Sequence, residues 1–142
     1  MERVEELIGE SEWIKGYPII KQLRPHLDEK TFIDLVALAA REENYRVKLM
    51  YSGLEPVAYI GFQPMITLYY GKYIWVSDLA ADQNHRSRGF GKRLLEHVEY
   101  EAKDNGYEGI ALSSNLQRTA AHRFYEEKMG YERSGYTFKK GF

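Results

Sequence analysis

The sequence predicts an α+β fold in which helices cover both faces of a mixed, mostly antiparallel sheet. Segments with the helical spacing of apolar residues alternate along the chain with segments whose pattern is typical of strands. With 142 residues, 44% of them apolar, the chain is long enough for one compact domain with a hydrophobic core. No linker, repeat or low-complexity stretch interrupts it. We therefore expect a single domain over residues 1–142.

The amino-terminal part predicts a strand followed by two helical segments. A first strand is expected over residues 2–8. The next stretch, 11–23, predicts an interrupted helix, because Pro18 lacks a backbone donor. Asp28 stands where an N-cap residue belongs, and apolar residues follow it at helical spacing as far as Arg41. The second helix is thus expected between these two residues.

The middle of the chain changes to strand periodicity. Alternating apolar residues over 45–51 and a partner stretch over 57–62 predict a hairpin with its turn at 52–55. Pro64 is expected to end the second of these strands, because proline cannot donate to a sheet ladder. The stretch YIWVSDLAA, residues 73–81, is rich in β-branched and aromatic residues and predicts a central strand.

The carboxy-terminal part predicts the remaining elements. A helix with one apolar stripe is expected to begin near Gly89 and to end at Asn105-Gly106, a pair typical of helix C-termini. A short strand over 109–113 and a helix over 119–129 come next. A closing hairpin is expected over 131–139.

Composition excludes several classes of function. The net charge of −1 combines 20 basic and 21 acidic residues, so no general electrostatic binding of nucleic acid or of an anionic membrane is expected. The absence of cysteine excludes disulfides, thiolate metal sites and a cysteine nucleophile. The four histidines lack metal-ligand spacing, so we predict no metal. Without a signal peptide or a long apolar run, the expected location is the cytoplasm.

The stretch HRSRGFGKR, residues 85–93, has the features of an anion-binding turn at the start of a helix. Amides of a first helical turn lack partners within the helix, and the helix dipole adds partial positive charge there. Gly89 and Gly91 leave these amides open to a phosphate group. A solvated basic helix start with incidental glycines is the alternative. Four cationic side chains offer charge-assisted contacts: Arg86, Arg88, Lys92 and Arg93.

Two nucleotide-binding motifs do not fit this stretch. A dinucleotide fingerprint needs a third glycine where Leu94 stands, and a P-loop needs glycine in place of Arg86. What remains is R-x-x-G-x-G, preceded by DLAADQNH and followed after the next strand by NLQRTAAHRFYEEKMGY. This ordered set, over residues 73–136, resembles the GNAT N-acetyltransferase superfamily. The resemblance implies the GNAT-like acyltransferase fold, with acetyl-CoA as co-substrate and an amine as acceptor.

The resemblance also implies which residues contact the co-substrate. The pantetheine arm is expected along the main chain of residues 79–81, like an added strand. The pyrophosphate is expected at the amides of residues 88–92, and Asn115 is expected to bind the arm from the opposite side. In full, the implied contacts are Leu79, Ala80, Ala81, Arg86, Ser87, Arg88, Gly89, Phe90, Gly91, Lys92, Asn115, Arg118 and Tyr125.

The chemistry expected is direct attack of the amine on the thioester in a ternary complex, because cysteine and a G-x-S-x-G elbow are both absent. Tyr125 is the expected acid for the leaving thiolate. Deprotonating an amine of pKa about 10.4 at pH 7 costs roughly 4.6 kcal/mol, so a base or water relay is also expected. Asp78 is the residue that we predict for this role, with a structural hydrogen-bond acceptor as its alternative.

Two other classes of function remain open from the sequence. One is a non-catalytic acyl-CoA sensor that uses the same phosphate-binding turn. The other is a module whose basic turn binds an acidic protein. Nothing in the amino-terminal half identifies the acceptor amine, and a homodimer is expected only from the habit of the superfamily.

Overall fold

The computed structural model describes residues 1–142 as two compact units, one over residues 1–111 and the other over residues 112–142. The first unit carries nearly the whole sheet and the helices on its two faces. The second carries a short helical segment and the carboxy-terminal tail. No helix in the protein is both long enough and apolar enough to cross a membrane.

The central sheet has five strands that follow one another in chain order, β1-β2-β3-β4-β5. The pairs β1/β2, β2/β3 and β3/β4 are antiparallel. A helix lies between β4 and β5 in the chain, which is the connection that parallel neighbours require. The sheet is therefore mixed and mostly antiparallel, as predicted. Its strands are β1 (Glu2–Leu7), β2 (Arg46–Ser52), β3 (Glu55–Thr67), β4 (Gly71–Ala81) and β5 (Gly109–Leu112).

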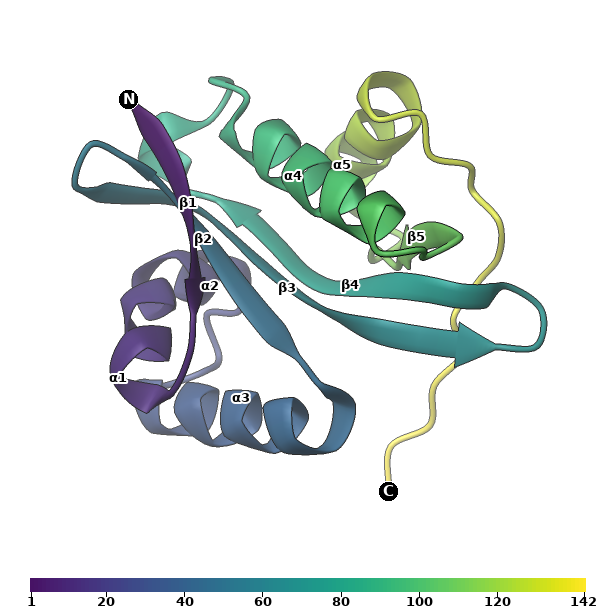
Figure 1. Ribbon diagram of the computed structural model, residues 1–142, viewed down its shortest axis with the longest axis horizontal. Coiled ribbons are helices and arrows are strands. Elements are labelled where there is room, and N and C mark those ends of the chain that lie inside the picture. The colour runs from purple at the N-terminus through teal and green to yellow at the C-terminus, as the bar shows by residue number, and fades with distance from the viewer. The chain divides into compact units, whose positions relative to one another are not determined.

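The amino-terminal helices pack on one face of this sheet (Figure 1). The interrupted helix consists of α1 (Glu10–Trp13), the 3-10 turn η1 (Ile14–Gly16) and α2 (Tyr17–Leu23). It is followed by α3 (Glu29–Glu43), whose predicted N-cap is confirmed. Asp28 accepts a hydrogen bond of 2.7 Å from the amide of Thr31. The core on this face contains Leu7, Ile19, Ile20, Phe32, Val36, Tyr45, Val47, Leu49, Tyr51, Tyr59 and Ala80.

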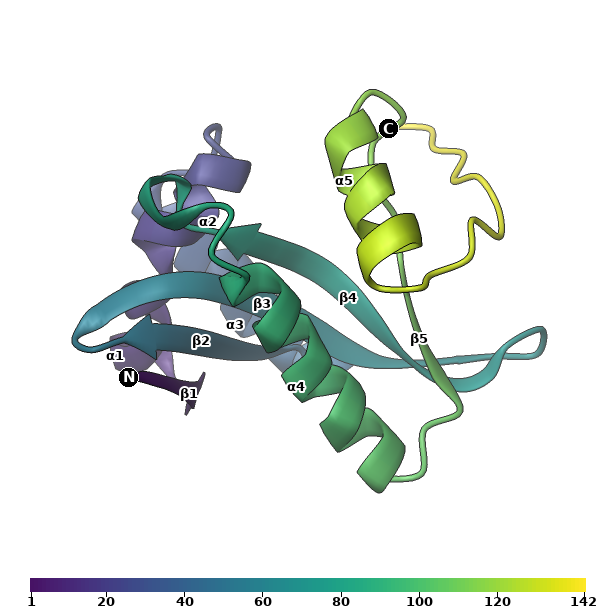
Figure 2. The same cartoon turned by 90° about the horizontal axis from the view of Figure 1, so that it is seen from above.

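Helix α4 (Phe90–Asp104) covers the other face and lies across β3 in the view of Figure 2. Its apolar stripe is buried, which is the reason that an amphipathic sequence of this length forms a stable helix here. The helix ends at Asn105, and Gly106 adopts a φ of 81°, so the predicted C-terminal signal is confirmed. The buried stripe consists of Phe90, Leu94, Leu95, Val98 and Ala102.

The predicted end of β3 at Pro64 is wrong. The strand continues to Thr67, and Pro64 pairs with Ile74 of β4. Pairing between β2 and β3 stops at Phe62, so beyond that residue β3 has a neighbour on one side only. Proline is tolerated in such an edge segment because the missing donor leaves no gap in a second ladder.

The closing hairpin predicted over residues 131–139 is also wrong, because residues 131–142 contain no strand. A two-stranded hairpin is marginal in water unless it packs against further structure. In this tail Tyr136 is 71% exposed and Phe138 is 91% exposed, so neither aromatic side chain is buried.

The predicted helix over 119–129 is present in the second unit. It consists of α5 (Thr119–Arg123) and one turn of π-helix, η3 (Phe124–Lys128). Gly130 follows with a φ of 73°, a conformation that favours glycine at the end of a helix.

Candidate functional site

Strand β4 carries a β-bulge next to the segment predicted to bind the pantetheine arm. Gly61 of β3 pairs with Asp78, whereas the next residue, Phe62, pairs with Val76. Ser77 is therefore an extra residue without a partner in the ladder, and its hydroxyl donates to Gln63 Oε1 at 2.9 Å. A bulge bends the strand and re-aims the residues that follow it. The backbone changes direction just before Leu79.

The end of β4 lies beyond the reach of β5. The amide of Glu108 donates to the carbonyl of Lys72 at 2.7 Å, so β5 begins beside the start of β4. Strand β5 has four residues, whereas β4 has eleven. A parallel strand of that length cannot pair with residues 79–81, so their outward N–H and C=O groups have no neighbour from β5. This is where an extended ligand can add as a strand.

The turn after β4 is held by side-chain hydrogen bonds. The carboxylate of Asp82 accepts from Gln22 Nε2 at 2.7 Å and lies 2.6 Å from His85 Nδ1. Gln22 Oε1 in turn accepts from the amide of Gln83 at 2.8 Å. Burial alone would raise the pKa of Asp82, but the hydrogen bonds from Gln22 and His85 outweigh it and lower that pKa. Asp82 is thus an ionised anchor that fixes the path from β4 to α4.

The start of α4 leaves its first amides without partners in the protein fold. Gly89 is the N-cap residue, with the left-handed values φ 77° and ψ 14°, and no side chain caps the helix. The first helical hydrogen bond runs from the amide of Arg93 to the carbonyl of Gly89 at 3.0 Å. The amides of residues 90–92 are consequently available to a ligand. The first turn also contains no acidic residue that would repel an anion.

The last residue of β4 lies beside this helix start. A Cβ atom placed on Gly91 would stand 3.8 Å from the Cβ of Ala81. The open end of β4 and the open amides of α4 therefore lie next to each other within the first unit.

The four cationic side chains of the turn differ in their contacts. Arg93 forms an ion pair with Glu2 and is therefore engaged by β1. Arg88 lies with its guanidinium carbon 5.4 Å from the centre of the Phe90 ring. Lys92 lies 3.9 Å from a carboxylate oxygen of Glu96, one turn along the helix. Arg86 is exposed and forms no hydrogen bond or ion pair. Arg86 and Arg88 are the guanidinium groups best placed to meet a diphosphate without losing a protein salt bridge.

Asp78, the predicted base, accepts hydrogen bonds on both carboxylate oxygens. Its Oδ1 lies 3.3 Å from Arg24 Nε, and its Oδ2 accepts from the Tyr45 hydroxyl at 2.7 Å. Tyr45 also lies 3.0 Å from the hydroxyl of Tyr59. Burial, together with the neighbouring Tyr59 and Asp78, raises the pKa of Tyr45 well above its usual value. Tyr45 therefore stays protonated and serves as a hydrogen-bond donor.

Sequence reasoning missed Arg24 and Tyr45. The only local sign for Arg24 is its place before Pro25, where a helix is expected to end. The sequence places Tyr45 only at the start of a strand, and its hydrogen bond to Asp78 is visible only in the structure.

Three further predicted residues lie in the second unit. The side chain of Asn115 accepts from the amide of Gln117 at 2.9 Å and so shapes the loop before α5. Arg118 is the N-cap residue of α5. Tyr125 lies in the π-helical turn, where its ring is 5.2 Å from that of Phe124 and 6.0 Å from that of Tyr131. The structure does not position these three residues relative to the first unit.

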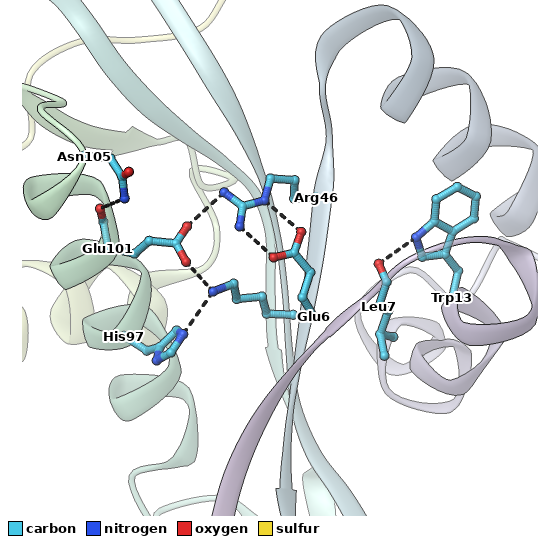
Figure 3. A network of polar contacts seen from close by, with 8 residues as sticks. Glu6, Leu7, Trp13, Arg46, His97, Glu101 and Asn105 are labelled. Carbon is cyan, nitrogen blue, oxygen red and sulfur yellow. Dashed lines mark hydrogen bonds and ion pairs between the residues drawn. The ribbon is translucent and has the colours of Figure 1, made fainter.

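A separate polar network lies between β1, β2 and α4 (Figure 3). Arg46 donates to Glu6 at 2.9 and 2.6 Å and to Glu101 at 2.8 Å. The buried Lys48 contacts Glu101 and lies 3.1 Å from His97 Nε2. A cavity of about 470 Å³ near Arg46 and Glu101 is lined by the carboxy-terminal half of α4, far along the helix from Gly89. This network joins strands to helix and is distinct from the turn.

The turn, the bulge and the open end of β4 all lie within a part of the chain that matches a known protein family. A model of the acetyltransferase (GNAT) family matches residues 11–131. The chain belongs to the GNAT acetyltransferase family. The expectation drawn from R-x-x-G-x-G and its flanking motifs is therefore confirmed.

Curated relatives of this GNAT protein are acetyltransferases. It is 34% identical over 140 residues to the uncharacterized N-acetyltransferase YhdJ of Bacillus subtilis, with 99% of each chain covered. It is 31% identical over 123 residues to the aminoalkylphosphonate N-acetyltransferase of Salmonella typhimurium, covering 86% of this chain and 79% of that one. Family and relatives support acetyl transfer as the general activity.

Solved structures agree on the fold. The aminoglycoside N-acetyltransferase AAC(6')-Iy in complex with CoA has a TM-score of 0.84 at 11% identity, covering 100% of this chain and 95% of that chain. A transcriptional regulator from Bacillus halodurans C-125 has a TM-score of 0.84 at 20% identity, with 100% of both chains covered. At these identities the likeness establishes the GNAT fold, and the predicted fold class is confirmed.

Proposed function

We propose that this protein is an acetyl-CoA-dependent N-acetyltransferase that moves an acetyl group to a primary amine by direct attack in a ternary complex. The observation that carries the proposal is the junction of two open backbone segments, the end of β4 at Ala81 and the uncapped start of α4 at Gly89. One segment suits an amide-bearing arm, and the other suits the diphosphate to which that arm is joined.

The residues of the turn fit this co-substrate. The diphosphate oxygens accept from the amides of residues 88–92, and Arg86 and Arg88 supply positive charge. Ser87 and Gly89 both have positive φ values, 68° and 77°, so the chain turns sharply just before the first turn of α4. The pantetheine arm pairs with residues 79–81. Asn115 and Arg118 of the second unit complete the proposed contacts with the arm and the nucleotide.

The proposed reaction has two proton transfers. The neutral amine attacks the thioester carbonyl carbon, the carbonyl oxygen becomes an oxyanion, and the amide of Leu79 stabilises it. The C–S bond then breaks, and the thiolate of coenzyme A takes a proton from the hydroxyl of Tyr125. The attacking nitrogen loses its extra proton to solvent through a water relay or to Asp78. The products are an acetylated amine and free coenzyme A.

The contacts of Asp78 limit how it acts as a base. Both of its oxygens already accept hydrogen bonds, from Arg24 and Tyr45. Each oxygen of an ionised carboxylate has a further lone pair, so Asp78 can keep both bonds and still accept a hydrogen bond from a water molecule. We therefore propose that Asp78 acts through a bound water rather than by direct contact with the amine.

The acceptor is proposed from the relatives and tested directly. The similarity to an aminoalkylphosphonate N-acetyltransferase makes aminoalkylphosphonates the first acceptors to try, followed by polyamines, amino acids, aminoglycosides and peptides with free amino termini. Each amine is incubated with acetyl-CoA and the release of free thiol is followed. Acetylation of at least one amine class above the rate of thioester hydrolysis is the expected result.

The Arg86→Gln variant tests the site, and Arg41→Gln is its matched control, because Arg41 is exposed on α3 and has no ion pair. We expect Arg86→Gln to raise the KM for acetyl-CoA about tenfold, the loss of one charge-assisted contact. Coenzyme A should also raise the melting temperature of the wild type. Binding of coenzyme A without turnover of any amine would favour the acyl-CoA sensor, and the absence of binding would favour the protein-binding module.

A further inference from the structure

The bulge in β4 needs support from outside the sheet. Ser77 has no partner in the ladder with β3, so its backbone groups must find hydrogen bonds elsewhere. Its carbonyl oxygen accepts from Arg24 Nη2 at 3.3 Å. Arg24, from the end of α2, thus hydrogen-bonds the backbone of β4 at the residue that has no partner in β3.

The same guanidinium group also holds the next residue. Arg24 Nε lies 3.3 Å from Asp78 Oδ1, and Arg24 Nη2 lies 3.2 Å from the same oxygen. The Tyr45 hydroxyl holds the other oxygen at 2.7 Å. Ser77 and Asp78 are consequently fixed from two directions, one through the backbone and one through the carboxylate.

Arg24 is held in place by its own backbone. It is the C-cap residue of α2, because the residue before a proline is disfavoured in helical conformation and Pro25 follows it. Its amide donates to the carbonyl of Ile20 at 2.8 Å, and its carbonyl accepts from the amide of Leu27 at 3.1 Å. Both backbone groups of Arg24 are therefore bound, and its side chain is held at the bulge by its contacts with Ser77 and Asp78.

We infer that Arg24 is a positioning residue for acetyl transfer, which rests on the function proposed above. It fixes the Ser77–Asp78 bulge and thereby the direction of the Leu79 amide that receives the oxyanion. A small rotation of that amide weakens a hydrogen bond that is made only in the transition state, so the effect falls on kcat. The binding of acetyl-CoA depends mainly on the turn at residues 86–92, which Arg24 does not contact.

The side chain of Arg24 contributes little to the hydrophobic core. It is 39% exposed, and its contacts are polar. Its removal should therefore change the bulge without unfolding the protein. This separates a positioning role from a general role in stability.

The experiment compares the full-length wild type, Arg24→Gln, Arg24→Lys and the control Arg41→Gln. For each protein, kcat and the KM for acetyl-CoA are measured with the best acceptor from the amine panel. Hydrogen exchange of the backbone amides over residues 74–81 is measured without ligand. Exchange reports on the bulge whether or not the enzyme turns over.

We expect Arg24→Gln to lower kcat at least tenfold, to leave the KM for acetyl-CoA within about threefold, and to speed exchange over 74–81 at least threefold. Arg24→Lys keeps the charge beside Asp78 but not both contacts, so its kcat should lie between those of Arg24→Gln and the wild type. Arg41→Gln should match the wild type in all measurements.

Two results would overturn the inference: exchange in Arg24→Gln equal to that of Arg41→Gln, or a rise in the KM for acetyl-CoA as large as the fall in kcat. If Arg24→Gln unfolds at the assay temperature, the same comparisons are made with Arg24→Lys. Failure of the proposed function looks different, because the wild type itself would then acetylate no amine.

Discussion

The hydroxyl of Tyr45 reaches Asp78 across a position that has no side chain, at a distance of 2.7 Å. That position is Gly61, which pairs with Asp78 in the ladder. A Cβ atom on Gly61 would lie 1.7 Å from the Tyr45 hydroxyl oxygen. The Tyr45 hydroxyl therefore occupies the volume that a side chain at position 61 would need.

Gly61→Ala should destabilise the fold. The methyl group must displace the buried Tyr45 ring, and overpacking of this kind costs about 1–3 kcal/mol. Urea unfolding measures the free energy. Gly135→Ala is the control, because nothing lies within 4 Å of a Cβ there, and it should change stability by less than about 0.5 kcal/mol. Equal stability of the two variants would show that Tyr45 does not occupy this space.

Ser87→Gly should stabilise the ligand-free protein. Ser87 has a φ of 68°, which costs an L-residue about 1–2 kcal/mol. Glycine removes this cost but adds entropy to the unfolded chain, so the expected net gain is about 0.5 kcal/mol. Chemical denaturation measures the free energy of unfolding. Ser52→Gly is the control: Ser52 is the last residue of β2, so the same change there should destabilise the protein. A loss at Ser87 would mean that its side chain supports the turn.

His97 should make stability depend on pH below neutrality. Burial and the neighbouring Lys48 lower the pKa of His97 from 6.5. As the pH falls below 6.5, the unfolded chain takes up a proton that the folded His97 resists, so the free energy of unfolding decreases in that window.

Glu101 affects stability at lower pH. Burial would raise the pKa of Glu101, but Lys48 and Arg46 lower it below 4.5. The stability that the ionised Glu101 contributes is lost as the pH falls through that lowered pKa.

His97→Gln should flatten the profile of unfolding free energy against pH just below pH 6.5, because glutamine does not titrate. His26→Gln, at an exposed position, should keep the slope of the wild type. Urea unfolding at a series of pH values gives both profiles. If the two variants have the same slope, the pH dependence does not come from His97.

Tyr125→Phe tests the proposed acid. Loss of a positioned proton donor should lower kcat about 100-fold and leave the KM for acetyl-CoA within about threefold. Steady-state thiol release measures both constants. Tyr136→Phe is the matched control, because Tyr136 is 71% exposed. Unchanged turnover in Tyr125→Phe would remove the acid role and leave the thiolate to depart unprotonated.

Local signals in the sequence determined the order of elements from β1 to the helix after β5, and they determined the turn at the start of α4. Asp28 stands directly before apolar residues at helical spacing, which predicts an N-cap, and its side chain does accept from the amide three residues later. Gly89 and Gly91 stand among four cationic side chains just before an apolar stripe of helical spacing, and this pattern predicts an anion-binding helix start. Such features depend on neighbours within one or two helical turns, and these are visible in the chain.

Only the tertiary structure decided which distant residues meet. Arg24, Tyr45 and Asp78 come from three separate elements, and no spacing in the chain predicts that they converge on a bulge. The neighbours of a strand likewise decide whether Pro64 ends it, and they decide whether the alternating residues after Tyr131 form a hairpin. The periodicity of apolar residues indicates which side of a segment is buried, whereas tertiary packing decides which strands become hydrogen-bond partners in the sheet.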